Sequence, residues 1–155
     1  MERRDILKSA STLAAASTVG MAGCNGILGG GGCDTPGDNL EDSLPDSDDY
    51  EMQGEATTGS GEQDNVESTV SALYIGPDDG EFLFGITQFS SSDEASSEAE
   101  NVSSDASGSD GAFGYIVVDS YVFVAFGPDE DSTTAIMKAS PTLSDGCVDD
   151  NIEFA

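Results

Sequence analysis

The chain has 155 residues, of which 31 are acidic and four are basic, and its formal net charge is -27. It contains no histidine, so no Ser/His/Asp or Cys/His nucleophilic arrangement can be built. So few Lys and Arg residues cannot neutralise a row of phosphates, which makes nucleic acid a poor partner. We therefore expect a protein that is not an enzyme, holds no cofactor and binds no nucleic acid.

The first residues have the parts of an export signal. Three of the four basic residues, Arg3, Arg4 and Lys8, precede a run rich in Ala, Ser and Thr at residues 9–20. This run is too short and too polar to span a bilayer core of about 30 Å. A basic start, a short apolar segment and a small-residue exit predict a signal peptide over residues 1–23.

The paired arginines indicate a particular export route. Arg3 and Arg4 resemble the twin-arginine export signal, which a receptor reads and which is not itself an anchor. Glu2 stands where that family usually has Ser or Thr, and Ile6 stands where it usually has Phe. The resemblance implies export of a folded protein, and the low hydrophobicity of residues 9–20 fits that route.

The signal ends at a cysteine. Residues 21–24, Met-Ala-Gly-Cys, resemble a lipobox, in which cleavage before the cysteine leaves a thiol that receives lipid; Met21 replaces the usual Leu. The resemblance implies lipid on Cys24 and a location at the cell membrane, facing the extracellular side. The alternative is a membrane-proximal helix with a chance cysteine.

Removal of the leader makes the charge more extreme. The leader carries three bases and two acids, so the chain from Cys24 keeps Lys138 as its one base against 29 acids, a net -28. Such self-repulsion destabilises a compact state in dilute salt. At molar salt it is largely screened, because the Debye length is about 3 Å. The composition resembles that of extreme halophiles, and with the leader the chain resembles a small haloarchaeal lipoprotein; the competing interpretation is an acidic disordered tail.

Residues 24–65 are predicted to form a flexible, lipidated tether. Four consecutive glycines at 29–32 precede a polar stretch with few apolar side chains, which cannot offset the entropy of ordering. A strand within residues 50–57 is the one element considered there. The acidic run at 46–49 lacks the spacing of a calcium loop, so we predict no metal site.

A small domain is predicted over residues 66–155. Alternating apolar residues indicate strands at 66–75 and 82–87, joined by a turn at 76–80. Ser91 and Glu94 match a capping box at the start of a helix that ends before residue 107.

The second half of the domain repeats this order. The apolar run 113–126 is too long for one strand, and a bend at Asp119 and Ser120 divides it into two strands. Three acids at 129–131 precede a second helix, which Pro141 ends or kinks. The order ββαββα predicts an α+β fold, a four-stranded antiparallel sheet with two helices on one face.

Two further sites follow from the sequence. If Cys24 carries lipid, Cys33 and Cys147 remain to form a disulfide, which is permitted outside the cell; the alternative is two free thiols. Asn101 begins the sequon Asn-Val-Ser and is a possible glycosylation site, although such sequons are often unused.

We therefore expect a membrane-anchored extracytoplasmic lipoprotein of halophilic type, with a display, binding or envelope role. Its membrane partner would be reached through the lipid on Cys24, and its protein or solute ligand is not specified. The alternative is a cation- or solute-binding accessory protein that uses surface carboxylates. A hydrolase acting through paired carboxylates is a third hypothesis, although no pair among the 29 acids is distinguished.

The charge generates a first prediction. We expect the domain to unfold as salt is lowered from molar concentration to about 0.1 M, because the Debye length then grows to about 10 Å and the carboxylates repel one another. Circular dichroism across the salt series measures this directly. A spectrum that stays the same over the whole range would contradict the halophilic interpretation.

Overall fold

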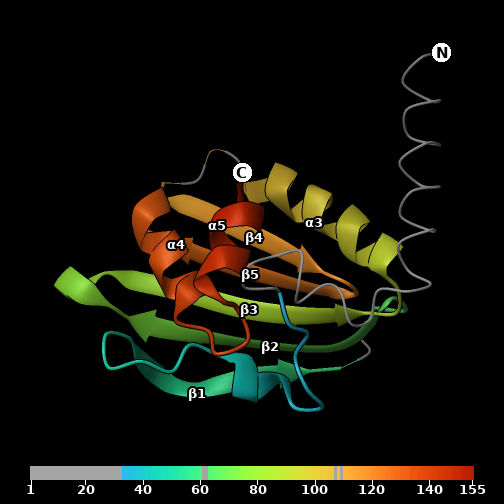
Figure 1. Ribbon diagram of the computed structural model, residues 1–155, viewed down its shortest axis with the longest axis horizontal. Coiled ribbons are helices and arrows are strands. Elements are labelled where there is room, and N and C mark those ends of the chain that lie inside the picture. The colour runs from blue at the N-terminus through green and yellow to red at the C-terminus, as the bar shows by residue number, and fades with distance from the viewer. Residues whose placement is uncertain (1–32, 61–62, 107, 109) are drawn as a thin grey trace.

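Residues 33–60, 63–106, 108 and 110–155 are described by the computed structural model. The predicted export signal and lipobox lie outside these residues. Within them the chain forms one open antiparallel sheet with helices against both faces (Figure 1). The α+β class expected from the sequence is confirmed.

Six strands make up the sheet in the part of the chain that is described, in the spatial order β1-β2-β3-β5-β4-β6. Their bounds are β1 Glu51–Gly59, β2 Val66–Ile75, β3 Glu81–Phe89, β4 Ala112–Val118, β5 Tyr121–Gly127 and β6 Glu153–Phe154. The described helices are α3 Ser92–Ala106, α4 Glu130–Lys138 and α5 Asp145–Asn151, with short 3-10 turns η1 Leu40–Ser43 and η2 Pro77–Asp79.

The two predicted hairpins are confirmed. β2 and β3 pair antiparallel around η2, where the Gly76 N–H donates to the Gly80 carbonyl at 2.8 Å. β4 and β5 pair antiparallel around Asp119, whose φ of 54° supplies the left-handed backbone that such a tight turn needs. The bend predicted within residues 113–126 is this turn.

The helix starts also follow local sequence rules. The Ser91 side chain accepts a hydrogen bond from the Glu94 N–H at 3.2 Å, which confirms the predicted cap, while the Glu94 carboxylate accepts from the Ser90 hydroxyl at 2.8 Å. Asp129 caps α4 by accepting from the Ser132 N–H at 2.8 Å, and this hydrogen bond lowers the pKa of its carboxyl. α4 ends at Lys138, before Pro141, as expected.

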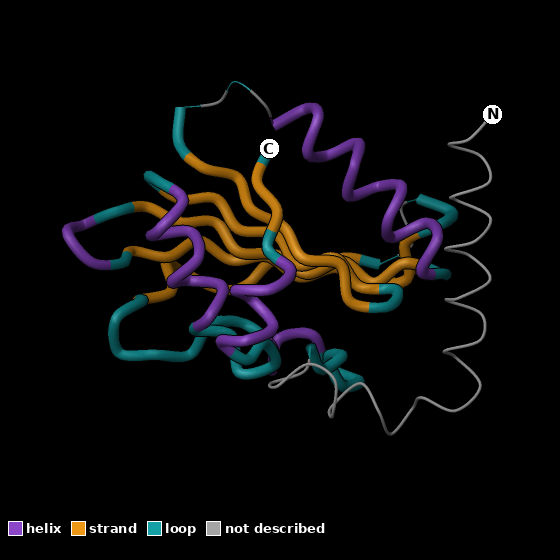
Figure 2. The backbone as a smooth tube through the Cα atoms, turned by 45° about the horizontal axis from the view of Figure 1, so that its top comes forward, coloured by secondary structure: helices purple, strands orange, loops and turns teal. Residues whose placement is uncertain are grey.

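Both faces of the central strands are buried, each in a separate core. On one face, Ile116 of β4 and Phe123 of β5 lie beneath Ile136 of α4 and Val148 of α5, and all four are fully buried. On the other face, α3 packs on β3, β4 and β5 through a smaller cluster (Figure 2). That cluster contains Phe89, Ala95, Ala99, Tyr115 and Val122.

The predicted arrangement of four strands with both helices on one face is wrong. The structure has two further strands and a further helix, α5, and α3 lies on the face opposite α4. The run 113–126 is apolar at nearly every position because β4 and β5 are covered on both faces, and such doubly buried strands read as continuous apolar runs.

The segment before β1 belongs to the fold. Leu40 and Leu44 are buried in the larger core, and the buried Ser140 hydroxyl donates to the Ser43 carbonyl at 2.6 Å. Cys33 is bonded to Cys147 of α5, as predicted, with a Cα–Cα distance of 5.0 Å. Residues 33–60, which the sequence assigned to the tether, therefore carry η1, β1 and part of the core.

The disulfide generates a second prediction. In the chain-entropy model a bond across 114 residues contributes roughly 4 to 5 kcal/mol. We expect the double variant Cys33→Ala with Cys147→Ala to lose stability of that order, measured by urea unfolding at molar salt. Cys24→Ser, which keeps both sulfurs of the bond, is the matched control. Equal unfolding midpoints for the two proteins would contradict the prediction.

Candidate functional site

An apolar row crosses one end of the sheet on the face that carries α3. Leu73 of β2 pairs in register with Leu83 of β3, and Leu83 pairs with Phe126 of β5. Their neighbours along each strand point into the larger core, so these three side chains point to the α3 face. Leu73 is 58% exposed and Leu83 is 38% exposed, the large apolar side chains that remain accessible within the described residues.

The row forms the floor of an open groove of about 890 Å³. The helix α3 packs over the other end of this face, near Phe89, and ends before it reaches the turn at η2 (Figure 1). The floor is therefore open because α3 does not extend over this end of the face. We call this surface the sheet-end groove; its floor is Leu73, Ile75, Leu83 and Phe126.

The rim of the groove is formed on one side by a turn with left-handed backbone angles and on the other by a glycine that contacts Phe126. Asp78 and Asp79 both have left-handed backbone angles, with φ of 59° and 57°. Left-handed non-glycine residues are uncommon, and two in succession hold the Asp79 side chain at the groove. On the opposite rim Gly111 has φ of 120°, and a Cβ there would lie 2.7 Å from the Phe126 ring. Phe126 thus packs directly over the Gly111 backbone.

The charged side chains that line the sheet-end groove are all acidic. They are Asp79, Glu81 and Asp110. Lys138, the only base in the described residues, lies on α4 across the sheet and forms an ion pair with Asp149 of α5. This ion pair raises the pKa of Lys138. The groove therefore offers an apolar floor and a negative rim, without a basic group to balance it.

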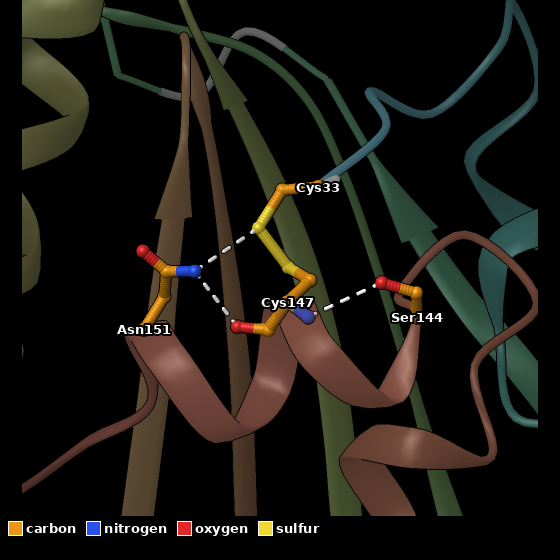
Figure 3. The surroundings of a disulfide bond; sticks show 4 residues. All are labelled: Cys33, Ser144, Cys147 and Asn151. Carbon is orange, nitrogen blue, oxygen red and sulfur yellow. Dashed lines mark hydrogen bonds between the residues drawn. A yellow bond between two sulfur atoms is a disulfide. The ribbon is translucent and has the colours of Figure 1, made fainter. Parts of the chain in front are cut away.

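The disulfide lies on the face opposite the groove. Cys147 is buried in α5, and Asn151 donates one hydrogen bond to its carbonyl at 2.8 Å and one to the Cys33 sulfur at 3.5 Å (Figure 3). Ser144 caps α5 by accepting from the Cys147 N–H at 3.2 Å. The chain therefore enters the described fold on the α4–α5 side of the sheet.

The other predicted sites stand as follows. Arg3, Arg4 and Cys24 lie outside the described residues. Asn101 is exposed on α3, where its amide donates to Glu98 at 3.4 Å, and its glycosylation remains a prediction. Where the structure is described, no cluster of three His, Cys, Asp or Glu residues is arranged to hold a metal ion. None of the described helices is long and apolar enough to cross a membrane.

Sequence reasoning missed the groove although its signal was present. Leu73 and Ile75 form a second apolar face on β2, opposite Tyr74, and Leu83 does the same on β3. A second apolar face on a strand indicates a second covering layer or an exposed surface. A prediction that places both helices on one face leaves this second apolar face without a covering element.

Comparison with known proteins identifies no relative: no family model, no curated protein and no solved structure matches this chain.

One buried polar group has no partner within the described fold. The Tyr74 side chain is 1% exposed in the larger core, and its hydroxyl makes no hydrogen bond there. Desolvation by this burial, with a smaller contribution from Asp46, raises the pKa of Tyr74 to about 12. The folded protein therefore holds this phenol neutral well above its ordinary pKa of 10.0.

Tyr74 generates a third prediction. Its raised pKa means that the stability it confers is present below pH 10 and is lost as pH rises to about 12. Tyr74→Phe should reduce this alkaline loss and should leave neutral stability equal or about 1 kcal/mol higher, since an unsatisfied hydroxyl is removed. Urea unfolding at a series of pH values measures both effects.

The matched control is Tyr115→Phe. The Tyr115 hydroxyl donates to the Glu153 carboxylate at 2.6 Å, so its removal should lower neutral stability by about 1 kcal/mol. A Tyr74→Phe protein that is less stable than the Tyr115→Phe protein at neutral pH would contradict the assignment of an unpartnered hydroxyl.

Proposed function

We propose that the protein is a membrane-anchored extracytoplasmic lipoprotein of halophilic type, whose domain displays a binding surface and performs no catalysis. Lipid on Cys24 would hold it at the outer side of the cell membrane after export through the twin-arginine signal. The observation that carries the proposal is the bond between Cys33 and Cys147.

The disulfide supports export. Structural disulfides form and persist in oxidising compartments and are rare in the cytosol. The chain has three cysteines, and two of them are joined in this bond. Cys24, at the end of the predicted signal, is then the cysteine left for lipid.

The disulfide also sets the length of the tether. Cys33 lies nine positions after Cys24, which corresponds to at most about 30 Å when fully stretched. A domain with a net charge of -28 would thus be held close to its membrane. One acyl chain gives only marginal anchoring, and this acidic domain adds no basic patch, so a stable anchor needs more than one chain on Cys24.

The sheet-end groove supports a binding role over the alternative use of surface carboxylates. Contiguous exposed apolar surface rimmed by polar groups marks interaction sites, and the groove has an apolar floor with an acidic rim. The described acids, in contrast, form no cluster suited to a cation. Saturable calcium binding in a calorimetric titration at molar salt would favour the alternative of a cation-binding accessory protein.

The anchor generates a fourth prediction. Cys24→Ser should move the protein from the membrane fraction to the soluble fraction or leave the leader uncleaved, because the acceptor of the lipid is gone. Cell fractionation with immunoblotting measures location and size together. The Cys33→Ala and Cys147→Ala double variant is the control, because it keeps Cys24 and should remain in the membrane fraction. A Cys24→Ser protein that stays membrane-bound at the mature size would overturn the anchor.

A further inference from the structure

The sheet-end groove is an apolar part of the sheet face that no described helix covers. Leu73 and Leu83 are neighbours in register and together with Phe126 extend across three strands. Elsewhere in the described residues the large apolar side chains are covered or half-covered. Apolar surface that is contiguous and rimmed by polar groups marks interaction sites, and here the two adjacent leucines lie on an apolar floor bordered by Asp79, Glu81 and Asp110.

The shape of the groove favours a polypeptide segment. It is open along the sheet face and holds about 890 Å³, with Ile75 and Phe126 extending the apolar floor beyond the two leucines. Apolar side chains from a bound segment can be covered by this floor, while the segment's backbone keeps access to water. The burial of apolar area drives such association, and high salt does not weaken it.

The charge of the rim defines the flanks of that segment. Asp79 and Glu81 lie at the turn end, and Asp110 lies on the other side. The only described base, Lys138, is on the opposite face and is already paired with Asp149. A second copy of this chain would bring another acidic rim against this one, whereas Lys or Arg beside an apolar core would meet carboxylates. Salt screens partly buried pairs in direct contact much less than separated surface charges, so charge complementarity at the rim selects a basic-flanked partner.

We propose that the sheet-end groove binds an apolar segment flanked by Lys or Arg from another protein on the extracytoplasmic side. The inference rests on the proposed function for its location. Because Cys33 is bonded to α5 on the opposite face, the short tether attaches behind the groove and leaves the groove directed away from the membrane. The binding itself does not depend on the anchor.

The test uses the full chain carrying Cys24→Ser at molar salt, so that its result is independent of lipid attachment. The probe is a fluorescein-labelled peptide, KKLFLVLKK, and its anisotropy is followed as protein is added. Two peptides are compared with it: one has Glu in place of every Lys, and the other has Ser in place of every apolar residue. We expect saturable binding of the first peptide, binding at least about tenfold weaker for the Ser peptide, and a smaller loss for the Glu peptide because molar salt screens part of the charge contribution.

Variants of the protein locate the binding. Leu73→Ser and Leu83→Ser change exposed side chains and should each weaken binding by about tenfold or more. Asp79→Asn keeps a residue that tolerates the left-handed backbone while removing the charge, and it should weaken binding less. Ala135→Ser, an exposed position on α4 across the sheet, is the matched control and should bind as the parent does. Circular dichroism of each variant establishes that it is folded.

Three results would overturn the inference. The first is no saturable binding of KKLFLVLKK. The second is binding that Leu73→Ser and Leu83→Ser leave unchanged. The third is sedimentation of the parent as a dimer that Leu73→Ser converts to a monomer, since the groove would then be occupied by a second copy. Each is distinguishable from failure of the anchor, which is read from the location of Cys24→Ser in cells.

Discussion

The bond between Cys33 and Cys147 ties the start of the described chain to its last helix, and the larger core depends on that closure. The segment that follows Cys33 places Leu40 and Leu44 over the strands that α4 and α5 leave uncovered. Hydrogen bonds from the loop after α4 to Ser43 hold the same segment in place. One covalent link thus joins residues far apart in the sequence into a single layer, which a small domain with so few apolar residues needs.

The acidic side chains lie outside the core that this disulfide helps to close. The acids lie on exposed or half-exposed positions, and the buried polar side chains are hydroxyls such as Thr133, which donates to the Ala112 carbonyl at 3.2 Å. Repulsion is therefore spread over the surface, where dissolved salt screens it, and the core carries no ionised group. This separation lets a chain with so high a net charge keep a conventional apolar interior.

The two faces of the sheet have different roles in the proposed function. One face is closed by α4, α5 and the disulfide-bonded segment, and it receives the tether. The other is closed by α3 at one end only, and its open end holds Leu73 and Leu83 between acidic rims. In that proposal attachment and recognition would be separated by the thickness of the sheet, so that an anchor close to a membrane would leave the binding surface free.

Local chemistry in the sequence determined the central strands, the turns at η2 and Asp119 and the Ser91 cap, because each depends on neighbouring residues. The pairing of Cys33 with Cys147 followed from the count of thiols only on the premise that Cys24 carries lipid. Local chemistry did not determine strand order, the face that each helix covers, the inclusion of residues 33–60 or the groove. Alternating apolar residues along a strand indicate that one face of the strand is apolar, but they do not indicate which distant segment covers that face. That choice is made by long-range packing, and the groove exists because α3 stops short of covering its face.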